Sequence, residues 1–214
     1  MNNMEQFLEN YKKSPITVSL ILFCALVYIV SVLLFGISMD AQQGIQFGAY
    51  NPVLVIFGHQ YYRLLTANFI HFGILHIVVN CYSLYGLGLF VESVLKTKKY
   101  LIVIFVSALS TTGIPCLLFL VNGFESNIVS GGISGVIFGI IGAIGALALT
   151  YKDIFLSIFK QLAPNLLLML LISFMVPSIS LSGHVSGLIG GFVTTYILLH
   201  MKAKSKNQYS DLIN

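Results

Sequence analysis

The sequence has very few charged residues. Only 8% of its 214 residues are Asp, Glu, Lys or Arg, whereas 57% are hydrophobic, and the mean hydropathy is +0.92. Soluble globular domains carry about 25% charged residues, so this composition excludes a soluble domain. It predicts an integral membrane protein of the all-α class.

Cysteine is scarce as well. Cys24, Cys81 and Cys116 lie within apolar segments at unrelated spacings, as is typical of small buried hydrophobic side chains and not of a disulfide framework or a metal cluster. A metal site built on histidines is also disfavoured. His71 and His76 are five residues apart and cannot share one helix face, no His-Glu-x-x-His motif is present, and no carboxylate lies near them. We therefore expect neither a metal nor another cofactor.

Long apolar stretches are what the sequence does contain. Six of them lack Asp, Glu, Lys and Arg, and each can cross or nearly cross a hydrocarbon core of about 30 Å at about 1.5 Å per helical residue. These segments are 16–37, 73–91, 100–121, 134–151, 162–177 and 183–200. The pattern predicts a core of six transmembrane helices over residues 16–200. A polar segment, 1–15, precedes this core and a basic tail, 201–214, follows it.

The positive charges predict the orientation of these helices. Ten of the eleven Lys and Arg residues fall at one end of the predicted bundle: Lys12, Lys13, Lys96, Lys98, Lys99, Lys152, Lys160, Lys202, Lys204 and Lys206. Short loops rich in Lys and Arg stay on the cytoplasmic side of a membrane. The protein is therefore predicted to lie in the cell (plasma) membrane with both termini cytoplasmic and Arg63 on the outer side. The net charge of +4 then reflects topology and contact with anionic lipids, and no nucleic-acid partner is expected.

The first external loop, 38–72, is long for a connection and mixes apolar runs with aromatic residues. It contains Tyr61, Tyr62 and Arg63. This mixture is typical of an interfacial element in the outer leaflet, with tyrosines at headgroup depth and Arg63 reaching lipid phosphates. On composition alone, an ordinary external loop explains the segment equally well.

Four polar side chains are predicted to share one layer near the outer surface. The second, fourth and sixth helices all run inward from that surface, and they carry His76 with Asn80, then Ser134, then His184 near their outer ends. His76 and Asn80 are four residues apart and therefore share one helix face. A serine in a membrane helix usually bonds only its own backbone, whereas an ionisable side chain there is by default a functional candidate.

Glycines flank Ser134 and His184 at four-residue spacing. They are Gly131, Gly135 and Gly139 on the fourth helix and Gly183, Gly187 and Gly191 on the sixth. Taken alone, such spacing indicates close helix packing and nothing more. If these two faces pack on each other, however, they bring Ser134 to His184, as a nucleophile and its base.

These residues, in this order, resemble those of the rhomboid intramembrane serine proteases. The similarity covers the following residues: Tyr62-Arg63, His71 with His76 and Asn80, Glu92, Gly132-Ile133-Ser134-Gly135, and Gly183-His184 with Gly187 and Gly191. The resemblance implies a six-helix rhomboid-like bundle with Ser134 as the nucleophile and His184 as the base. It also implies that His76 and Asn80 are oxyanion-hole donors, with Gly132 and His71 in support.

Two positions depart from the family pattern. Tyr62 stands where the family often has tryptophan. Phe138 stands where a tyrosine commonly stacks on the catalytic histidine, although its ring can still supply that contact. No acidic residue is predicted at the same depth, so packing, on Phe138 for instance, must orient His184 in place of a carboxylate. Glu92, at the cytoplasmic end of its helix, is interpreted as a structural hydrogen-bond acceptor.

The predicted activity is serine endopeptidase cleavage of single-span membrane proteins, close to the outer face of the bilayer. The shortness of the fifth helix and the family resemblance indicate this helix and the loop 178–182 as the substrate gate. One alternative is a catalytically inactive relative that binds membrane clients, which would have no need of all four polar residues. Another is a small transporter, whose polar midplane site and inverted repeat are absent from the sequence. The sequence reveals neither the physiological substrate nor the oligomeric state.

Overall fold

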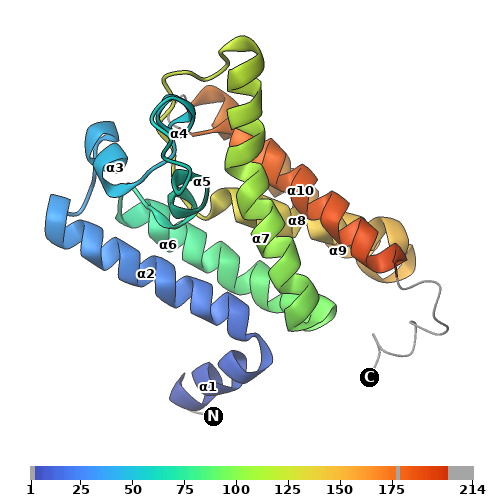
Figure 1. Cartoon of the computed structure of the whole chain (residues 1–214). Coiled ribbons are helices and arrows are strands. Elements are labelled where there is room, and N and C mark those ends of the chain that lie inside the picture. Colours follow the sequence, from blue (N-terminus) through green and yellow to red (C-terminus); the bar gives the residue numbers. More distant parts are fainter. Residues whose placement is uncertain (1–2, 177–178, 202–214) are drawn as a thin grey trace.

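The computed structural model describes residues 3–176 and 179–201, which fold into helices joined by short connections (Figure 1). The helices are α1 Asn3–Lys13, α2 Pro15–Phe35, α3 Ala41–Phe47, α4 Pro52–Ile56, α5 Arg63–Thr66, η1 Ala67–Phe69, α6 Ile74–Ser83, η2 Leu84–Gly88, α7 Leu89–Asn122, α8 Ser134–Thr150, α9 Lys152–Met175 and α10 Leu181–His200. No strand occurs within the described ranges, which confirms the all-α prediction.

Four helical stretches are long and apolar enough to cross a membrane by length and composition. They are α2, the continuous stretch Ile74–Asn122, α9 and α10, while α8 is apolar but shorter. The stretch Ile74–Asn122 reverses direction at Lys96, whose φ of 63° is not helical, and its two arms run antiparallel (Figure 1). The chain is therefore a multi-pass membrane protein. Each predicted segment is largely helical, but the number of crossings remains a prediction.

One predicted boundary is wrong. The fifth helix was expected to begin at residue 162, but α9 already begins at Lys152 and continues through Pro164. The charges at Lys152 and Lys160 led to the late start, although an exposed helix end tolerates such charges. The polar segment 1–15 contains helix α1, which was not predicted. Residue 177 and the basic tail with Lys202, Lys204 and Lys206 lie outside the described residues.

Helix α8 lies at the centre of the bundle. Its buried residues include Val136, Ile140 and Ile144, and helix α10 packs directly against it. A Cβ atom added to Gly187 or Gly191 would collide with the backbone carbonyl oxygen of Gly135 or Gly139, respectively. The predicted contact between the two glycine faces is therefore confirmed, and it brings the two backbones closer than side chains would allow.

Glu92 is almost fully buried and caps the start of α2. Its carboxylate accepts hydrogen bonds from the backbone N–H groups of Ile16, at 3.0 Å, and Thr17, at 2.8 Å. The first N–H groups of a helix have no partner within the helix, so this carboxylate satisfies two of them. The prediction of a structural acceptor is confirmed.

The segment 38–72 is folded rather than extended. Short helices α3, α4 and α5 shape it, with exposed Phe57, Tyr61 and Tyr62 on its surface. The prediction that Arg63 reaches lipid phosphates is wrong. Its guanidinium is buried and donates to the backbone carbonyl oxygens of Ile45 and Ala49, so the cation is bound inside the segment and does not reach lipid. The placement of this segment in the outer leaflet remains a prediction.

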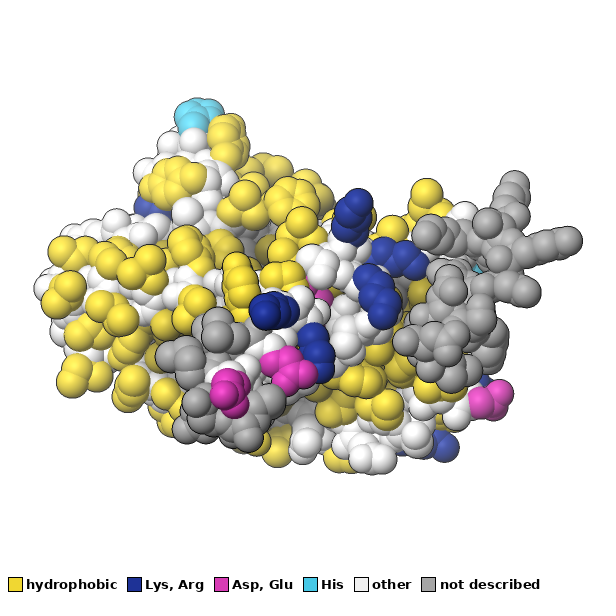
Figure 2. Space-filling model, turned by 90° about the horizontal axis from the view of Figure 1, so that it is seen from below, with side chains coloured by type: hydrophobic (Ala, Val, Ile, Leu, Met, Phe, Trp, Pro, Cys, Tyr) yellow, Lys and Arg dark blue, Asp and Glu magenta, His cyan; other side chains and the backbone are white. Residues whose placement is uncertain are grey.

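Lysine side chains gather on one end of the molecule. Figure 2 views that end, where dark blue Lys and Arg atoms occupy the middle and hydrophobic side chains surround them. The exposed lysines at the connections are Lys12, Lys13, Lys96, Lys98, Lys152 and Lys160. This arrangement agrees with the predicted cytoplasmic face, and the orientation itself remains a prediction.

Candidate active site

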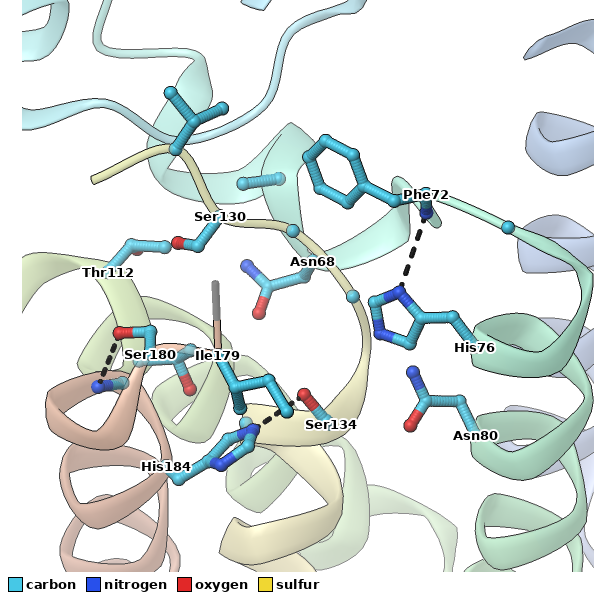
Figure 3. Close-up of a pocket in the computed structure, with 18 of the residues that line it drawn as sticks. Asn68, Phe72, His76, Asn80, Thr112, Ser130, Ser134, Ile179, Ser180 and His184 are labelled. Carbon is cyan, nitrogen blue, oxygen red and sulfur yellow. Dashed lines mark hydrogen bonds between the residues drawn. The ribbon is translucent and has the colours of Figure 1, made fainter. Parts of the chain in front are cut away.

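The N-terminal turns of α6, α8 and α10 meet at the end of the bundle opposite the lysines. Together with the loop before α8 they enclose a pocket of about 900 Å³ (Figure 3). Its lining includes five of the residues singled out from the sequence: His76, Asn80, Gly132, Ser134 and His184. The predicted shared layer is therefore present in the structure.

Ser134 and His184 lie in direct contact in this pocket. Ser134 is the first residue of α8, and its Oγ lies 2.8 Å from Nε2 of His184 in the first turn of α10. Ser180 caps α10, because its side chain accepts a hydrogen bond of 3.0 Å from the backbone N–H of Gly183. The cap and the glycine contact below it together fix the position of His184 relative to Ser134.

The imidazole of His184 stacks on Phe138. The two ring centroids are 4.2 Å apart and the rings are nearly parallel, at 11°. Phe138 is fully buried one turn below Ser134, so the nucleophile and the stacking ring belong to one rigid helix. The departure from tyrosine at this position therefore preserves the ring contact.

Sequence reasoning missed Ser173, the second hydrogen-bond partner of His184. Ser173 lies on α9, is only 4% exposed, and its Oγ is 2.8 Å from Nδ1 of His184. The same Oγ donates to the carbonyl oxygen of Met169 at 2.7 Å. Ser173 is the single hydroxyl in the otherwise apolar run 166–176. That isolation was the available signal, although a lone membrane serine usually bonds only its own helix.

A carboxylate does occur near this end of α10, contrary to the expectation from sequence. Glu125, in the loop after α7, accepts a hydrogen bond from the side chain of Ser182. The side-chain partners of the His184 ring nitrogens are nevertheless the hydroxyls of Ser134 and Ser173. Glu125 therefore secures the start of α10 instead of orienting the imidazole.

His76 and Asn80 face the pocket from α6 (Figure 3). The backbone N–H of Phe72 donates to Nδ1 of His76 over 3.4 Å, so a neutral ring carries its hydrogen on Nε2. Among the described residues, the buried Nδ2 of Asn80 has no hydrogen-bond partner. Both side chains therefore present N–H donors that are free to bind a negatively charged oxygen.

Gly132 shapes the wall between these donors and Ser134. Its φ of 118° lies in the left-handed region that favours glycine, and an added Cβ would lie 2.7 Å from Nε2 of His76. The backbone N–H of Gly132 donates to the carbonyl oxygen of Ala67 at 2.9 Å. Only glycine permits this close approach of the loop to His76.

His71 lies behind the pocket lining. Its ring centroid is 5.0 Å from that of His76, and its Nδ1 contacts the carbonyl oxygen of Phe69 at 3.1 Å. Burial, reinforced by the neighbouring His76, lowers the pKa of His71 to about 3. His71 is therefore neutral at physiological pH and supports His76 without adding charge to the site.

A hydroxyl bonded to an imidazole, beside unpartnered N–H donors and a helix N-terminus, has the parts that acyl transfer requires. Comparison with known proteins agrees with this arrangement. The family model for the Rhomboid domain matches residues 58–201. The rhomboid protease GluP of Bacillus subtilis (strain 168) is 34% identical over 121 residues, which cover 56% of this chain but only 22% of that relative. The chain belongs to the rhomboid family.

Proposed function

We propose that this protein is an intramembrane serine endopeptidase in which Ser134 is the nucleophile and His184 the general base. The observation that carries the proposal is the 2.8 Å contact between Ser134 Oγ and His184 Nε2 inside a pocket. A hydroxyl is a weak nucleophile by itself and needs an adjacent base within about 2.6 to 3.2 Å. The relative from Bacillus subtilis is named a rhomboid protease, which supports the same activity.

The reaction follows from this geometry. His184 Nε2 accepts the hydroxyl proton as Ser134 Oγ bonds to the substrate carbonyl carbon, and it then gives the proton to the departing amine as the C–N bond breaks. The acyl-serine is next attacked by a water molecule, whose proton passes through the same nitrogen. Ser134 then leaves, which releases the new carboxyl end and restores the free hydroxyl.

Three donors stand where the negative charge on the carbonyl oxygen develops. Two are Nε2–H of His76 and Nδ2–H of Asn80, and the third is the backbone N–H of Ser134 at the start of α8. That N–H lacks a partner within its helix and lies at the positive end of the helix dipole. Such preorganised donors act mainly on the transition state, so they raise the turnover rate.

We infer that the substrates are single-span membrane proteins in the lipid bilayer, cut near the outer face of the cell membrane, with both termini of the enzyme cytoplasmic. The lysine distribution supports this orientation, which the predicted six crossings would also require. Helix α9 and the loop 178–182 form the proposed gate. Residue 178 lies outside the described part of the chain, whereas Ile172 and Ile179 line the pocket. The match to the relative from Bacillus subtilis spans 22% of that relative's length.

The test is cleavage by the purified protein. The wild type, Ser134→Ala and His184→Ala are incubated in detergent micelles with a panel of single-span membrane proteins, and fragments are identified by mass spectrometry. The wild type should cut at least one substrate, and each variant should lose at least about 10³-fold in rate while remaining folded. Ser157→Ala, an exposed serine on α9, should retain wild-type cleavage.

Two results would contradict the proposal. If Ser134→Ala or His184→Ala kept more than about a few per cent of the wild-type rate, the assigned pair would be wrong. Removing either member of a nucleophile–base pair lowers the cleavage rate far more than that. If the wild type bound the panel proteins but cut none of them, the alternative of an inactive client-binding relative would replace the enzyme.

A further inference from the structure

Ser173 occupies an unusual place on helix α9. The surrounding side chains Leu167, Leu171 and Phe174 are more than half exposed on the outside of the bundle. Ser173 is turned inward, where only 4% of it is exposed, and it contacts the imidazole of His184. The hydrogen bond to the Met169 carbonyl oxygen would already satisfy the Ser173 hydroxyl within α9. The additional contact with His184 is therefore not required by the helix itself.

The hydrogen bonds around Ser173 determine which nitrogen of His184 carries the hydrogen. A serine hydroxyl has one hydrogen to donate and two lone pairs that accept. Ser173 donates its hydrogen to the Met169 carbonyl oxygen at 2.7 Å, so toward His184 its Oγ can only accept. The nitrogen 2.8 Å away, Nδ1, must therefore be the N–H donor.

The hydrogen on Nδ1 of His184 leaves Nε2, on the other side of the ring, able to act as a base. A neutral imidazole carries one hydrogen, so an Nδ1–H leaves Nε2 with a free lone pair. Nε2 is the atom 2.8 Å from Ser134 Oγ, and it must accept a proton to act as a base. The chain of bonds runs from Ser134 through His184 and Ser173 to Met169, with every donor facing an acceptor.

We propose that Ser173 is a positioning residue that holds His184 in its Nδ1–H tautomer, in the place that a carboxylate occupies in a three-residue serine hydrolase site. The proposal rests on the proposed function and deepens it. A neutral hydroxyl stabilises the imidazolium less than a carboxylate would, so its main effects are on the tautomer and the ring orientation. Because Ser173 belongs to α9 and His184 to α10, the position of α9 and the state of the base are linked.

The tautomer of His184 can be measured in the protein with Ser173 unchanged. Protein labelled with ¹⁵N-histidine in detergent micelles gives separate nitrogen signals for protonated and unprotonated ring positions, and the His184 signals are those that disappear in His184→Ala. At a pH where the ring is neutral, the wild type should show Nδ1 protonated and Nε2 unprotonated. The opposite pattern in the wild type would overturn the proposal.

The variants test whether Ser173 causes this pattern. Ser173→Ala should give a mixture of tautomers and lower kcat by about 10-fold to 10²-fold, less than the roughly 10⁴-fold cost of a forced wrong tautomer, with KM nearly unchanged. Ser173→Thr keeps an Oγ that can bond the carbonyl four residues back, so it should restore both the pattern and most of kcat. Ser157→Ala is the matched serine control on the same helix.

Failure of this proposal differs from failure of the proposed function. Full activity in Ser134→Ala would reject the proposed function. An inactive Ser134→Ala together with a Ser173→Ala variant of wild-type kcat and unmixed tautomer would reject only the role of Ser173. If Ser173→Ala does not fold, the wild-type spectrum and the Ser173→Thr variant still decide the question, because an Nδ1 without hydrogen in either one contradicts the bond to Ser173.

Discussion

Helices α8 and α9 follow each other in the chain, and both are predominantly apolar, yet their surroundings differ. Thirteen of the seventeen residues of α8 are buried, whereas only three of the twenty-four residues of α9 are. Helix α8 carries the proposed nucleophile and the ring that stacks on His184, whereas α9 contributes the hydroxyl on Nδ1. The proposed nucleophile is thus held by the more enclosed of these two helices, and the proposed base is oriented in part by the less enclosed one.

Side-chain size accounts for this difference. Between apolar helices in lipid no hydrophobic force favours burial, so close contact depends on backbones that can approach each other. In α8, the missing Cβ atoms of Gly135 and Gly139 make room chiefly for side chains of α7, and that of Gly142 makes room for the backbone of α10. Helix α9 offers a run of leucines, of which Leu167 and Leu168 are largely exposed. We therefore expect substitutions on the two helices to differ sharply.

The largest effect is expected where α8 and α10 touch. In Gly191→Ala the added Cβ would overlap the carbonyl oxygen of Gly139, so the two helices must separate. A misplacement of about 1 Å can lower the rate by about 10²-fold, and the thermal unfolding midpoint should fall as well. The matched control is Gly113→Ala, where no atom of the described residues, apart from the neighbouring backbone of the same helix, lies within 4 Å of the added Cβ. Equal rates and midpoints for the two variants would show that the glycine contact does not set the geometry.

A second large effect is expected at the oxyanion donors. Asn80→Ala removes a buried N–H donor that has no other partner in the described structure, and it should lower kcat by about 10²-fold while KM changes little. Asn165→Ala removes an exposed amide on α9 and should change neither constant. Kinetics on one cleaved substrate measure both variants. A change confined to KM would reassign Asn80 to substrate contact.

The substrate should respond more moderately. Presenting an extended peptide to Ser134 requires breaking helical hydrogen bonds that lipid cannot replace. Gly and Pro lower the cost of opening a helix by roughly 1 and 3 kcal/mol relative to Ala. Replacing such residues by Leu in the outer half of a cleaved substrate, away from the cut site, should slow cleavage several-fold. An unchanged rate would mean that the enzyme reads only local sequence in an already unwound stretch.

The smallest effect is expected on the lipid-facing side of α9. Leu168 is 55% exposed, so Leu168→Ala should change the free energy of unfolding by less than about 0.5 kcal/mol. Ile140 on α8 is fully buried, and Ile140→Ala should cost about 2 to 5 kcal/mol because it leaves a cavity. Reversible unfolding in mixed micelles compares the two. Similar costs would mean that α9 is packed as tightly as α8.

The sequence predicted the parts of the site whose signals are local. Glycines at four-residue spacing reported the helix contact, and Ser134 and His184 were conspicuous beside them. The sequence did not reveal that Arg63 binds carbonyl oxygens within its own segment, since this depends on how the segment folds back on itself. It also did not single out Ser173. A hydroxyl among leucines satisfies its own helix equally well, and only the packing of α9 against α10 shows that it reaches His184.

The start of α9 was missed for a related reason. The charges at Lys152 and Lys160 are local signs of a loop, but an exposed helix end tolerates them. These charges lie at the end of the bundle where other lysines gather. Local signs therefore placed the apolar part of the helix correctly and its polar beginning wrongly.

The most direct measurement of the central claim, that the contact of α8 with α10 turns Ser134 into a nucleophile served by His184, is covalent labelling by a fluorophosphonate. An activated serine displaces fluoride and keeps the phosphonyl group, and peptide mass spectrometry then identifies the labelled residue. We predict a single adduct on Ser134 in the wild type and labelling at least about 10²-fold slower in His184→Ala, because the base is absent. An adduct on another serine alone, or equal labelling of Ser134 in both proteins, would contradict the account.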